Sequence, residues 1–417
     1  MAALGRGWHQ APWWGKLPSI MPKNFDTIAI HGGEGERVLG QPVTAGPVLS
    51  TTYYTHPDAV GFSASDLQAD APHFYSRWSN PTLDLLERRL AELEGGEAAL
   101  SFASGMAAIT ALFHEHLGAG DHLVLSDVCY AGVAEYAHQA LPRLGVEVSH
   151  VDTSDPANVA AALRPNTRLV HIETPANPIL RLTDIAAVAE IAHHGGALLS
   201  VDSTIATPIG TNPLALGADF AVHSLTKYLC GHGDALGGAV IGRADAIAGL
   251  RRNGLIHLGA ALSPWSAYLI LRGIETLPLR MEKHEANARA VAEWLETHPK
   301  VRRVLWPGLA SHPQAELARR QMRNFSGLLS FSVTSGSAEM ARRVAERLQL
   351  VSFAVSLGKT KSLCFYIPTD DLLRASFRLS GRQEADFRDW AGEGVFRVSV
   401  GLENAAEIIA DFEQALG

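Results

Sequence analysis

The chain has 417 residues, of which 47% are hydrophobic and 19% are charged, and its formal net charge is −8. A chain of this length can bury a large core and should divide into two or more domains. Its basic residues form no block, which argues against a nucleic-acid partner, and no run of about 18 apolar residues predicts a membrane span. Three widely spaced cysteines, Cys129, Cys230 and Cys364, predict neither a disulfide framework nor a metal site, and they favour a reducing cytoplasm.

The N-terminal 19 residues carry Trp8, Trp13 and Trp14 among glycines and prolines. They lack the apolar core of a signal peptide. We interpret these 19 residues as an arm that is flexible or packed on a partner, or as an unusual extension. Residues 1–75 together are expected to form an N-terminal extension and subunit-crossing arm. The leucine spacing that follows, at residues 83, 86, 90 and 93, predicts a helix that stops at Gly95-Gly96.

From about residue 97 to residue 241, short apolar runs alternate with Ala-rich amphipathic segments such as residues 183–194. This alternation predicts an α/β domain whose mostly parallel, seven-stranded sheet is covered by helices on both faces. In such sheets ligands bind at the carboxyl ends of the strands. The predicted strands are residues 98–103, 122–126, 146–151, 169–173, 197–202, 219–223 and 238–241.

The remainder of the chain predicts a separate C-terminal α+β domain. Residues 281–298 have the spacing of a long helix, new strands are expected near residues 327–333, and another helix is expected at residues 338–348. We therefore place the sheet domain at residues 76–270 and the C-terminal domain at residues 271–417.

A lysine, Lys227, lies between small hydroxyl residues and a glycine-rich run, directly after a predicted strand. Its amine can form a Schiff base with an aldehyde, and the hydroxyls of Ser224 and Thr226 can bind a phosphate. These are the groups that pyridoxal phosphate (PLP) requires of a protein. The motif alone is not specific, because most lysines are solvated surface charges.

Four other segments offer groups suited to the same cofactor. Gly105 and Met106 open a predicted helix whose amides can bind an anion, and Asp202 ends a buried strand where it can pair with a pyridinium N–H. Asn177 can hydrogen-bond a ring hydroxyl, and Arg397 can bind an amino-acid carboxylate through two parallel hydrogen bonds. Each has an ordinary alternative: respectively a strand–helix turn, a helix N-cap, an Asn-Pro turn and an exposed charge on an edge strand.

Taken in this order, the segments resemble the transsulfuration (Cys/Met metabolism) family of fold-type I PLP-dependent enzymes. That family includes cystathionine γ-lyase, cystathionine γ-synthase, cystathionine β-lyase and methionine γ-lyase. The resemblance runs from about Asp26 to the C-terminus, and it includes residues 75–82 (YSRWSNPT), 308–313 (GLASHP) and 397–403 (RVSVGLE). It implies the fold-type I PLP-dependent transferase fold.

The resemblance also implies roles for individual residues. Lys227 would hold PLP as a Schiff base and then transfer protons, Asp202 would pair with the pyridine nitrogen, and Tyr130 would stack on the ring and act as a base. The other implied contacts are Gly105, Met106, Ser224 and Thr226 for the phosphate, Tyr75 and Arg77 for the phosphate of a neighbouring subunit, Asn177 for the ring hydroxyl, and Arg397 and Ser356 for the substrate carboxylate.

Two loops are among the segments that depart from the family pattern. Gly-His-Ser-Asp appears as residues 231–234 (GHGD), and Ser-Leu-Gly-Gly-x-Glu-Ser appears as residues 356–362 (SLGKTKS). Lys361 thus replaces a glutamate near the distal end of the substrate. A lysine there would disfavour a distal ammonium by about 1 to 4 kcal/mol, depending on solvation. The alternative is that Lys361 points to solvent.

These expectations converge on a cytoplasmic homotetramer, a dimer of active dimers, that acts on a small amino-acid substrate. We favour γ-elimination from a sulfur- or oxygen-substituted amino acid, with release of an α-keto acid and ammonia. γ-Replacement, as in cystathionine γ-synthase or a homoserine-ester sulfhydrylase, and cystathionine β-lyase activity stay open, because they use the same first steps. A further alternative is an inactive PLP-fold binding protein, which the presence of Lys227, Asp202 and Arg397 argues against.

Overall fold

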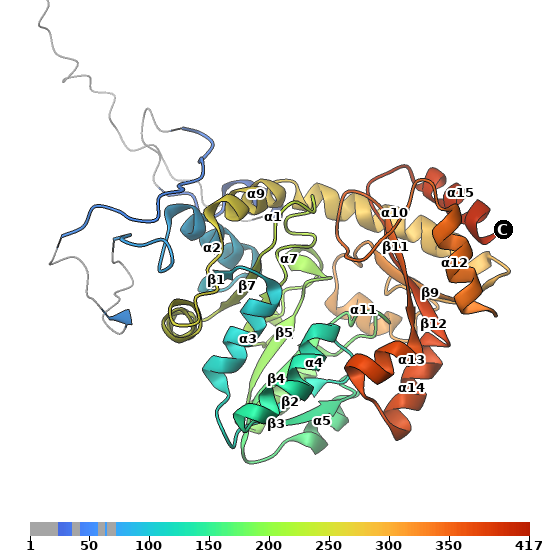
Figure 1. Cartoon of the computed structure of the whole chain (residues 1–417), viewed down its shortest axis with the longest axis horizontal. Coiled ribbons are helices and arrows are strands. Elements are labelled where there is room, and N and C mark those ends of the chain that lie inside the picture. The colour runs from blue at the N-terminus through green and yellow to red at the C-terminus, as the bar shows by residue number, and fades with distance from the viewer. Residues whose placement is uncertain (1–23, 36–41, 57–62, 65–71) are drawn as a thin grey trace, which may run out of the picture.

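The computed structural model describes residues 24–35, 42–56, 63–64 and 72–417 (Figure 1). The tryptophan-containing segment at the start of the chain lies outside the described residues. Within the described ranges, no helix has both the length and the apolar character that crossing a bilayer requires.

The first half of the structure is built on a seven-stranded sheet with the order β1-β7-β6-β5-β4-β2-β3. Strands β3, β2, β4, β5 and β6 run parallel to one another, whereas β7 runs antiparallel to both β1 and β6. Every predicted strand is present within two residues of its predicted bounds, so the predicted fold class is confirmed. The strands are β1 (Ala98–Phe102), β2 (His122–Ser126), β3 (Glu147–Val151), β4 (Thr167–Glu173), β5 (Leu198–Asp202), β6 (Phe220–His223) and β7 (Gly238–Gly242).

Helices cover both faces of this sheet because successive side chains of each strand point to opposite sides. In β4, Leu169 packs into the core beneath α3 and α4, while its neighbour Val170 packs against α6. In β7, Val240 faces the first of these cores and Ile241 faces α2 and α9. The covering helices are α2 (Pro81–Glu94), α3 (Gly105–His116), α4 (Ala131–Gln139), α5 (Pro156–Ala162), α6 (Ile185–His194), α8 (Ala244–Leu250) and α9 (Pro264–Ile274).

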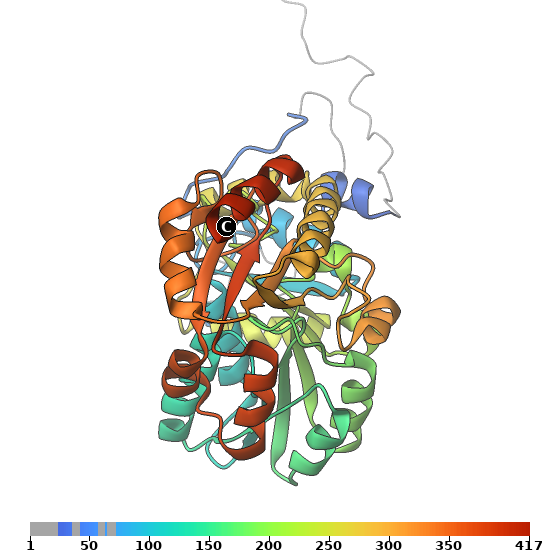
Figure 2. The same ribbon diagram turned by 90° about the vertical axis from the view of Figure 1, so that its right-hand side faces the viewer.

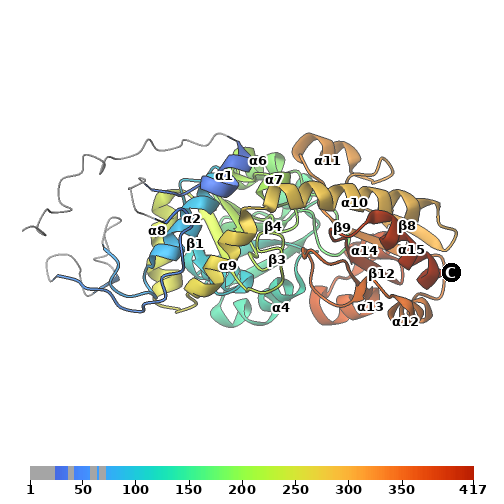
Figure 3. The ribbon, with the colours of Figure 1, turned by 90° about the horizontal axis from the view of Figure 1, so that it is seen from above.

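Helix α10 (Leu277–Thr297) links the two halves and runs from α1 and α7 to the second sheet (Figures 1 and 3). The second sheet has the order β10-β11-β12-β9-β8, and α10, α12 and α15 pack into its core. This arrangement confirms the predicted C-terminal α+β region. Its elements are β8 (Val301–Leu305), β9 (Leu328–Val333), β10 (Ser352–Phe353), β11 (Leu363–Pro368), β12 (Gly394–Ser399), α11 (Ala315–Gln321), α12 (Ser337–Arg347), α13 (Thr369–Leu372), α14 (Gly381–Ala391) and α15 (Ala405–Leu416). The two short helices against α10 are α1 (Phe25–His31), near the N-terminus, and α7 (Thr207–Gly210), which follows β5.

The two halves share buried surface. Phe377 and Phe387, which precede and lie within α14, are buried in the core beneath α3 and α4, so helices of the second half lie beside the first sheet (Figure 2). Ser330 on β9 donates a hydrogen bond of 2.6 Å to the carbonyl oxygen of Pro178, in the loop that follows β4. The carboxyl end of the first sheet therefore faces the second sheet.

Candidate active site

Two buried carboxyl groups lie side by side at the carboxyl edge of the first sheet. β4 ends at Glu173 and β5 ends at Asp202, and these two residues are paired in register. Asp202 accepts a hydrogen bond of 3.0 Å from the amide of Thr204, and Glu173 accepts hydrogen bonds from the amides of Tyr130 and Asn177. Burial raises the pKa of both carboxyl groups, and the charge of Asp202 raises the pKa of Glu173 further.

Lys227 reaches the same edge from the loop that follows β6. Its Nζ donates a hydrogen bond of 3.2 Å to Oγ of Ser356, a residue of the second half of the chain. Burial lowers the pKa of the Lys227 amine, and the positive charges of Arg397 and Lys359 lower it further. A lowered pKa increases the neutral fraction of the amine, which is the form that attacks an aldehyde.

Arg397 lies on β12, which has β11 on one side and β9 on the other. The alternative interpretation of Arg397 as a charge on an edge strand is therefore wrong. Its guanidinium donates a 2.9 Å hydrogen bond to Oδ1 of Asn177 and a 3.1 Å hydrogen bond to the carbonyl oxygen of Ser356. Ser356 has a φ of +86°, a conformation uncommon in residues other than glycine and frequent at functional sites.

A short anion cradle adjoins these residues at the start of α3. The N-cap Ser104 accepts a hydrogen bond from the amide of Ala107, while the first amides of any α-helix have no partner within the helix. A Cβ atom placed on Gly105 would lie 2.9 Å from Cβ of Ser224, so only glycine allows Ser224 to approach the helix end this closely. The Gly105 and Met106 amides and the Ser224 hydroxyl can together bind a phosphate.

Tyr130 is the N-cap residue of α4, and its side chain is 48% exposed. Its ring and Met106 converge on Gly132, since a Cβ atom placed there would lie 2.8 Å from Cε1 of Tyr130 and 3.4 Å from Sδ of Met106. The aromatic ring therefore stands next to the anion cradle and presents an uncovered surface. Such a surface is suited to stacking against a planar ligand.

These groups fit PLP. Among the described residues Asp202 forms no ion pair, although it is buried, so a cationic pyridinium N–H would match its carboxylate. The amides at the start of α3 suit the phosphate of PLP, and the Lys227 amine, whose pKa is lowered, suits the aldehyde. Among the residues that the structure describes, no group of three or more potential metal ligands is found.

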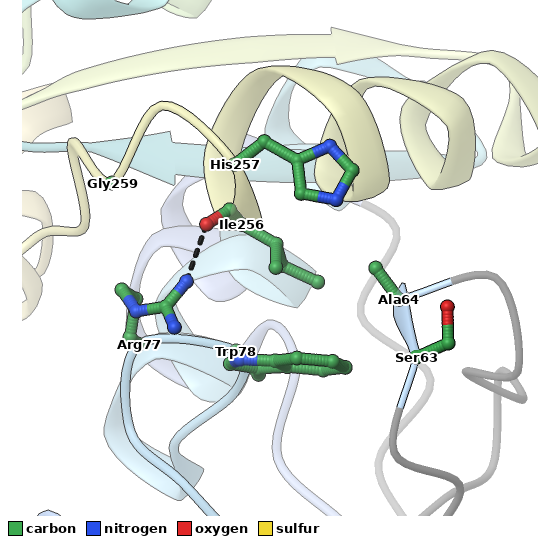
Figure 4. A pocket seen from close by; sticks show the side chains of 7 residues that line it. All are labelled: Ser63, Ala64, Arg77, Trp78, Ile256, His257 and Gly259. Atoms are coloured by element: carbon green, nitrogen blue, oxygen red, sulfur yellow. Dashed lines mark hydrogen bonds between the residues drawn. The ribbon is translucent and has the colours of Figure 1, made fainter.

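Tyr75 and Arg77 lie apart from the Lys227 site, near Ile256. Arg77 donates a hydrogen bond to the carbonyl oxygen of Ile256 and stacks over the Tyr75 ring at 5.5 Å. Arg77 and Trp78 line a cavity of about 650 Å³ opposite Ile256 and His257 (Figure 4). In the described part of this single chain, no hydrogen bond or ion pair links Tyr75 or Arg77 to Lys227.

Two expected site residues are directed differently from the prediction. The Thr226 hydroxyl donates to the carbonyl oxygen of Gly237 and accepts from its amide, so its proton is engaged in the protein. Lys361 is exposed. The hydroxyl of the next residue, Ser362, donates instead to Glu403 in the interior. In this chain Lys361 thus points to solvent, as the second of the two interpretations expects.

Two residues near the site were not assigned by the sequence analysis. Glu173 is paired in register with Asp202. Both residues end apolar runs of the sequence, and this shared pattern could have indicated that their carboxyl groups lie together. Lys359 is the lysine whose charge acts on Lys227, two residues before Lys361. No spacing rule distinguishes these two lysines, because both lie in a loop between β10 and β11.

Comparisons with known proteins agree with this geometry. The sequence model of the family described as "Cys/Met metabolism PLP-dependent enzyme" matches residues 26–417. The chain is 43% identical over 403 residues to the L-methionine gamma-lyase of Porphyromonas gingivalis, which covers 96% of this chain and 99% of the relative. It is 40% identical over 399 residues to the O-succinylhomoserine sulfhydrylase of Pseudomonas aeruginosa, with 94% and 95% covered.

The fold agrees as well. The crystal structure of metB from Corynebacterium glutamicum superimposes with a TM-score of 0.83 at 35% sequence identity, covering 94% of this chain and 98% of that structure. The predicted family and the predicted cofactor are thereby confirmed. The chain belongs to the PLP-dependent enzymes of cysteine and methionine metabolism, and pyridoxal phosphate is its cofactor.

Proposed function

We propose that the protein is a γ-lyase that acts on sulfur- or oxygen-substituted amino acids. The observation that carries this proposal is the similarity, over nearly the full chain, to an L-methionine gamma-lyase, together with the Lys227–Ser356–Arg397 hydrogen bonds beside Asp202. One substituted amino acid and one water would give the leaving group in its protonated form, the four-carbon α-keto acid 2-oxobutanoate, and ammonium.

Each residue of the site would have a separate role in the reaction, set by its position. PLP, when bound, supplies an electron sink for charge that develops at the substrate α-carbon. Asp202 would keep a proton on the ring nitrogen, and Arg397 would bind the substrate carboxylate through two hydrogen bonds. The Lys227 amine would remove the proton from Cα and deliver protons at neighbouring carbons. Tyr130 would cover the ring, and Asn177, held by Arg397, would contact the ring hydroxyl.

The remaining expected contacts belong to the same proposal. The phosphate would be held by the amides of Gly105 and Met106 and by the Ser224 hydroxyl. The Thr226 hydroxyl already donates its proton to Gly237, so it would contact the phosphate as an acceptor from a protonated phosphate oxygen. Ser356 would help to position the substrate carboxylate through the backbone carbonyl that it offers to Arg397.

The purified holoenzyme should release 2-oxobutanoate and ammonium in equal amounts from at least one of methionine, homocysteine, cystathionine and the homoserine esters. We expect a turnover of about 1 per second or faster with the preferred substrate, as is usual for enzymes. Coupled assays of keto acid and ammonium measure both products. Release of pyruvate instead would show elimination at Cβ and would contradict the proposal.

The same assay with an added thiol separates the second candidate. The similarity to an O-succinylhomoserine sulfhydrylase favours γ-replacement as that candidate. A replacement enzyme would convert homoserine ester and thiol into a thioether and would release little keto acid. Thioether as the main product would therefore reassign the reaction.

We further propose a cytoplasmic homotetramer with active sites shared within each dimer, and a division of the chain at residues 1–75, 76–270 and 271–417. The separation of Tyr75 and Arg77 from Lys227 within one chain supports shared sites. The proposed domain boundary at residue 270 falls within α9, just before α10 carries the chain to the second sheet.

Mixing two inactive variants tests the shared sites. Arg77→Ala and Lys227→Ala should each lose activity, whereas mixed dimers should contain one intact site out of two. In an equal mixture about half of the dimers are mixed, so about a quarter of the wild-type activity should return. Each variant incubated alone is the control. If tagged subunits are shown to exchange and no activity returns, Arg77 does not act across subunits.

A further inference from the structure

Lys359 is a part-buried cation held beside Lys227 by a loop that is fixed on both sides of it. The loop joins β10 to β11. The amide of Gly358 donates a 2.8 Å hydrogen bond to Oγ of Ser399, and the amide of Thr360 donates a 3.0 Å hydrogen bond to the carbonyl oxygen of Gly231. Lys359 therefore starts from a defined backbone position.

Two of the departures from the family pattern meet at this lysine. Lys359 stands where the family pattern has glycine, and Gly233 stands where it has serine. A Cβ atom placed on Gly233 would lie 2.8 Å from both Cδ and Nζ of Lys359, so the lysine side chain occupies the space that a serine would need. Gly233 also has a φ of +71°, which favours glycine. The side chain of Lys359 therefore lies where a Cβ atom at position 233 would project.

The position of Lys359 places a third positive charge at the site, after Lys227 and Arg397. Its charge is one of those that lower the pKa of Lys227, whereas Lys361 makes no such contribution. Within the described ranges Lys359 forms no ion pair, and the carboxylates of Asp202 and Glu173 accept hydrogen bonds from backbone amides. A ligand anion would meet an uncompensated ammonium here.

We propose that Lys359 is a specificity-determining residue that selects substrates with an anionic distal group, such as a homoserine half-ester of a dicarboxylic acid. This inference rests on the proposed function. With the substrate carboxylate on Arg397 and the α-carbon beside Lys227, the substrate side chain can extend past the Lys359 ammonium. A lysine offers a mobile point charge with three donors, which suits a terminal carboxylate and repels a terminal ammonium.

The test compares O-succinyl-L-homoserine with O-acetyl-L-homoserine, esters of the same alcohol of which only the first carries a distal carboxylate. For each holoenzyme, kcat/KM is measured from keto-acid release. Lys359→Met keeps the length of the side chain and removes its charge, so the succinyl-to-acetyl ratio should fall on the order of tenfold. Lys359→Arg should retain the ratio. Lys361→Met, a neutralised lysine in the same loop, is the matched control and should leave it unchanged.

A binding measurement separates this inference from the proposed function. L-2-aminopimelate differs from L-norleucine only by a terminal carboxylate, and neither carries a leaving group. Relative to the wild-type holoenzyme, the Lys359→Met holoenzyme should bind L-2-aminopimelate with a Kd on the order of tenfold higher. Its Kd for L-norleucine should be unchanged, and calorimetry measures both values. Absence of 2-oxobutanoate from every substrate would overturn the γ-lyase assignment and would leave this binding result standing.

Three outcomes would overturn the role of Lys359. In the first, Lys359→Met changes neither the succinyl-to-acetyl ratio of kcat/KM nor the ratio of the two Kd values, which would mean that the ammonium does not contact the distal group. Both ligands could weaken equally, which would indicate a structural role for the loop. Lys359→Met could instead bind PLP more weakly in an absorbance titration while the substrate ratio is retained, which would assign the lysine to the cofactor.

Discussion

Lys227→Ala is expected to reduce turnover by at least about 10³-fold while the fold remains intact. The lysine provides both the covalent attachment and the proton transfer, and general acid–base catalysis alone contributes about 10² to 10⁴-fold. Among the described residues, Lys227 is the lysine that donates a hydrogen bond to Ser356, whereas the side chain of the neighbouring Lys359 lies against Gly233. The measurement is keto-acid release by the purified variant, with circular dichroism and thermal melting to confirm the fold.

Borohydride reduction gives this prediction a second readout. In the wild-type enzyme, reduction should fix the cofactor on the peptide that contains Lys227, as located by mass spectrometry. Lys361→Ala removes an exposed lysine of the adjoining loop and serves as the control, with activity and labelling retained. A label on another lysine, or near-wild-type turnover by Lys227→Ala, would contradict the assignment.

Asp202→Asn is expected to lower kcat by orders of magnitude with little change in shape. An asparagine can still accept the hydrogen bond from the Thr204 amide, but it has no charge to hold a proton on the ring nitrogen. Without that proton the electron sink is weaker and the barrier at Cα rises. The measurement is kcat with the preferred substrate at saturating PLP.

Asp219→Asn is the matched control for this variant. Asp219 precedes β6, at the opposite edge of the sheet, where it accepts hydrogen bonds from the Leu199 amide and from His193. Its loss should affect stability more than kcat. A reduction in Asp202→Asn of less than about tenfold, which corresponds to about 1.4 kcal/mol of barrier, would mean that Asp202 is not the partner of the ring nitrogen.

Local sequence patterns were sufficient for the elements of this fold. Strands such as β2 (His122–Ser126) were predicted within two residues, and α2 (Pro81–Glu94) ends at the predicted glycine pair, because apolar periodicity and glycine breaks are properties of the neighbouring residues. The family and its cofactor were also accessible, since the ordered segments around Gly105, Asp202 and Lys227 each carry their chemistry in a few consecutive residues.

The convergence of the site was decided by tertiary structure. Arg397 is interior and not on an edge because β12 pairs with β9, some 60 residues earlier, and with β11. Glu173 joins Asp202 because β4 and β5 are parallel and in register. Neither pairing can be read from the residues of one strand, because strand order depends on contacts between segments far apart in the sequence.

The same reason explains why the sequence did not distinguish the two lysines of the loop between β10 and β11. The sequence alone determined that this loop departs from its family pattern by gaining positive charge. Only the folded chain decided that Lys361 is exposed and that Lys359 lies against Gly233, because the direction of a loop side chain is set by the hydrogen bonds that fix its neighbours. Those partners, Gly231 and Glu403, belong to other parts of the chain and come together only on folding.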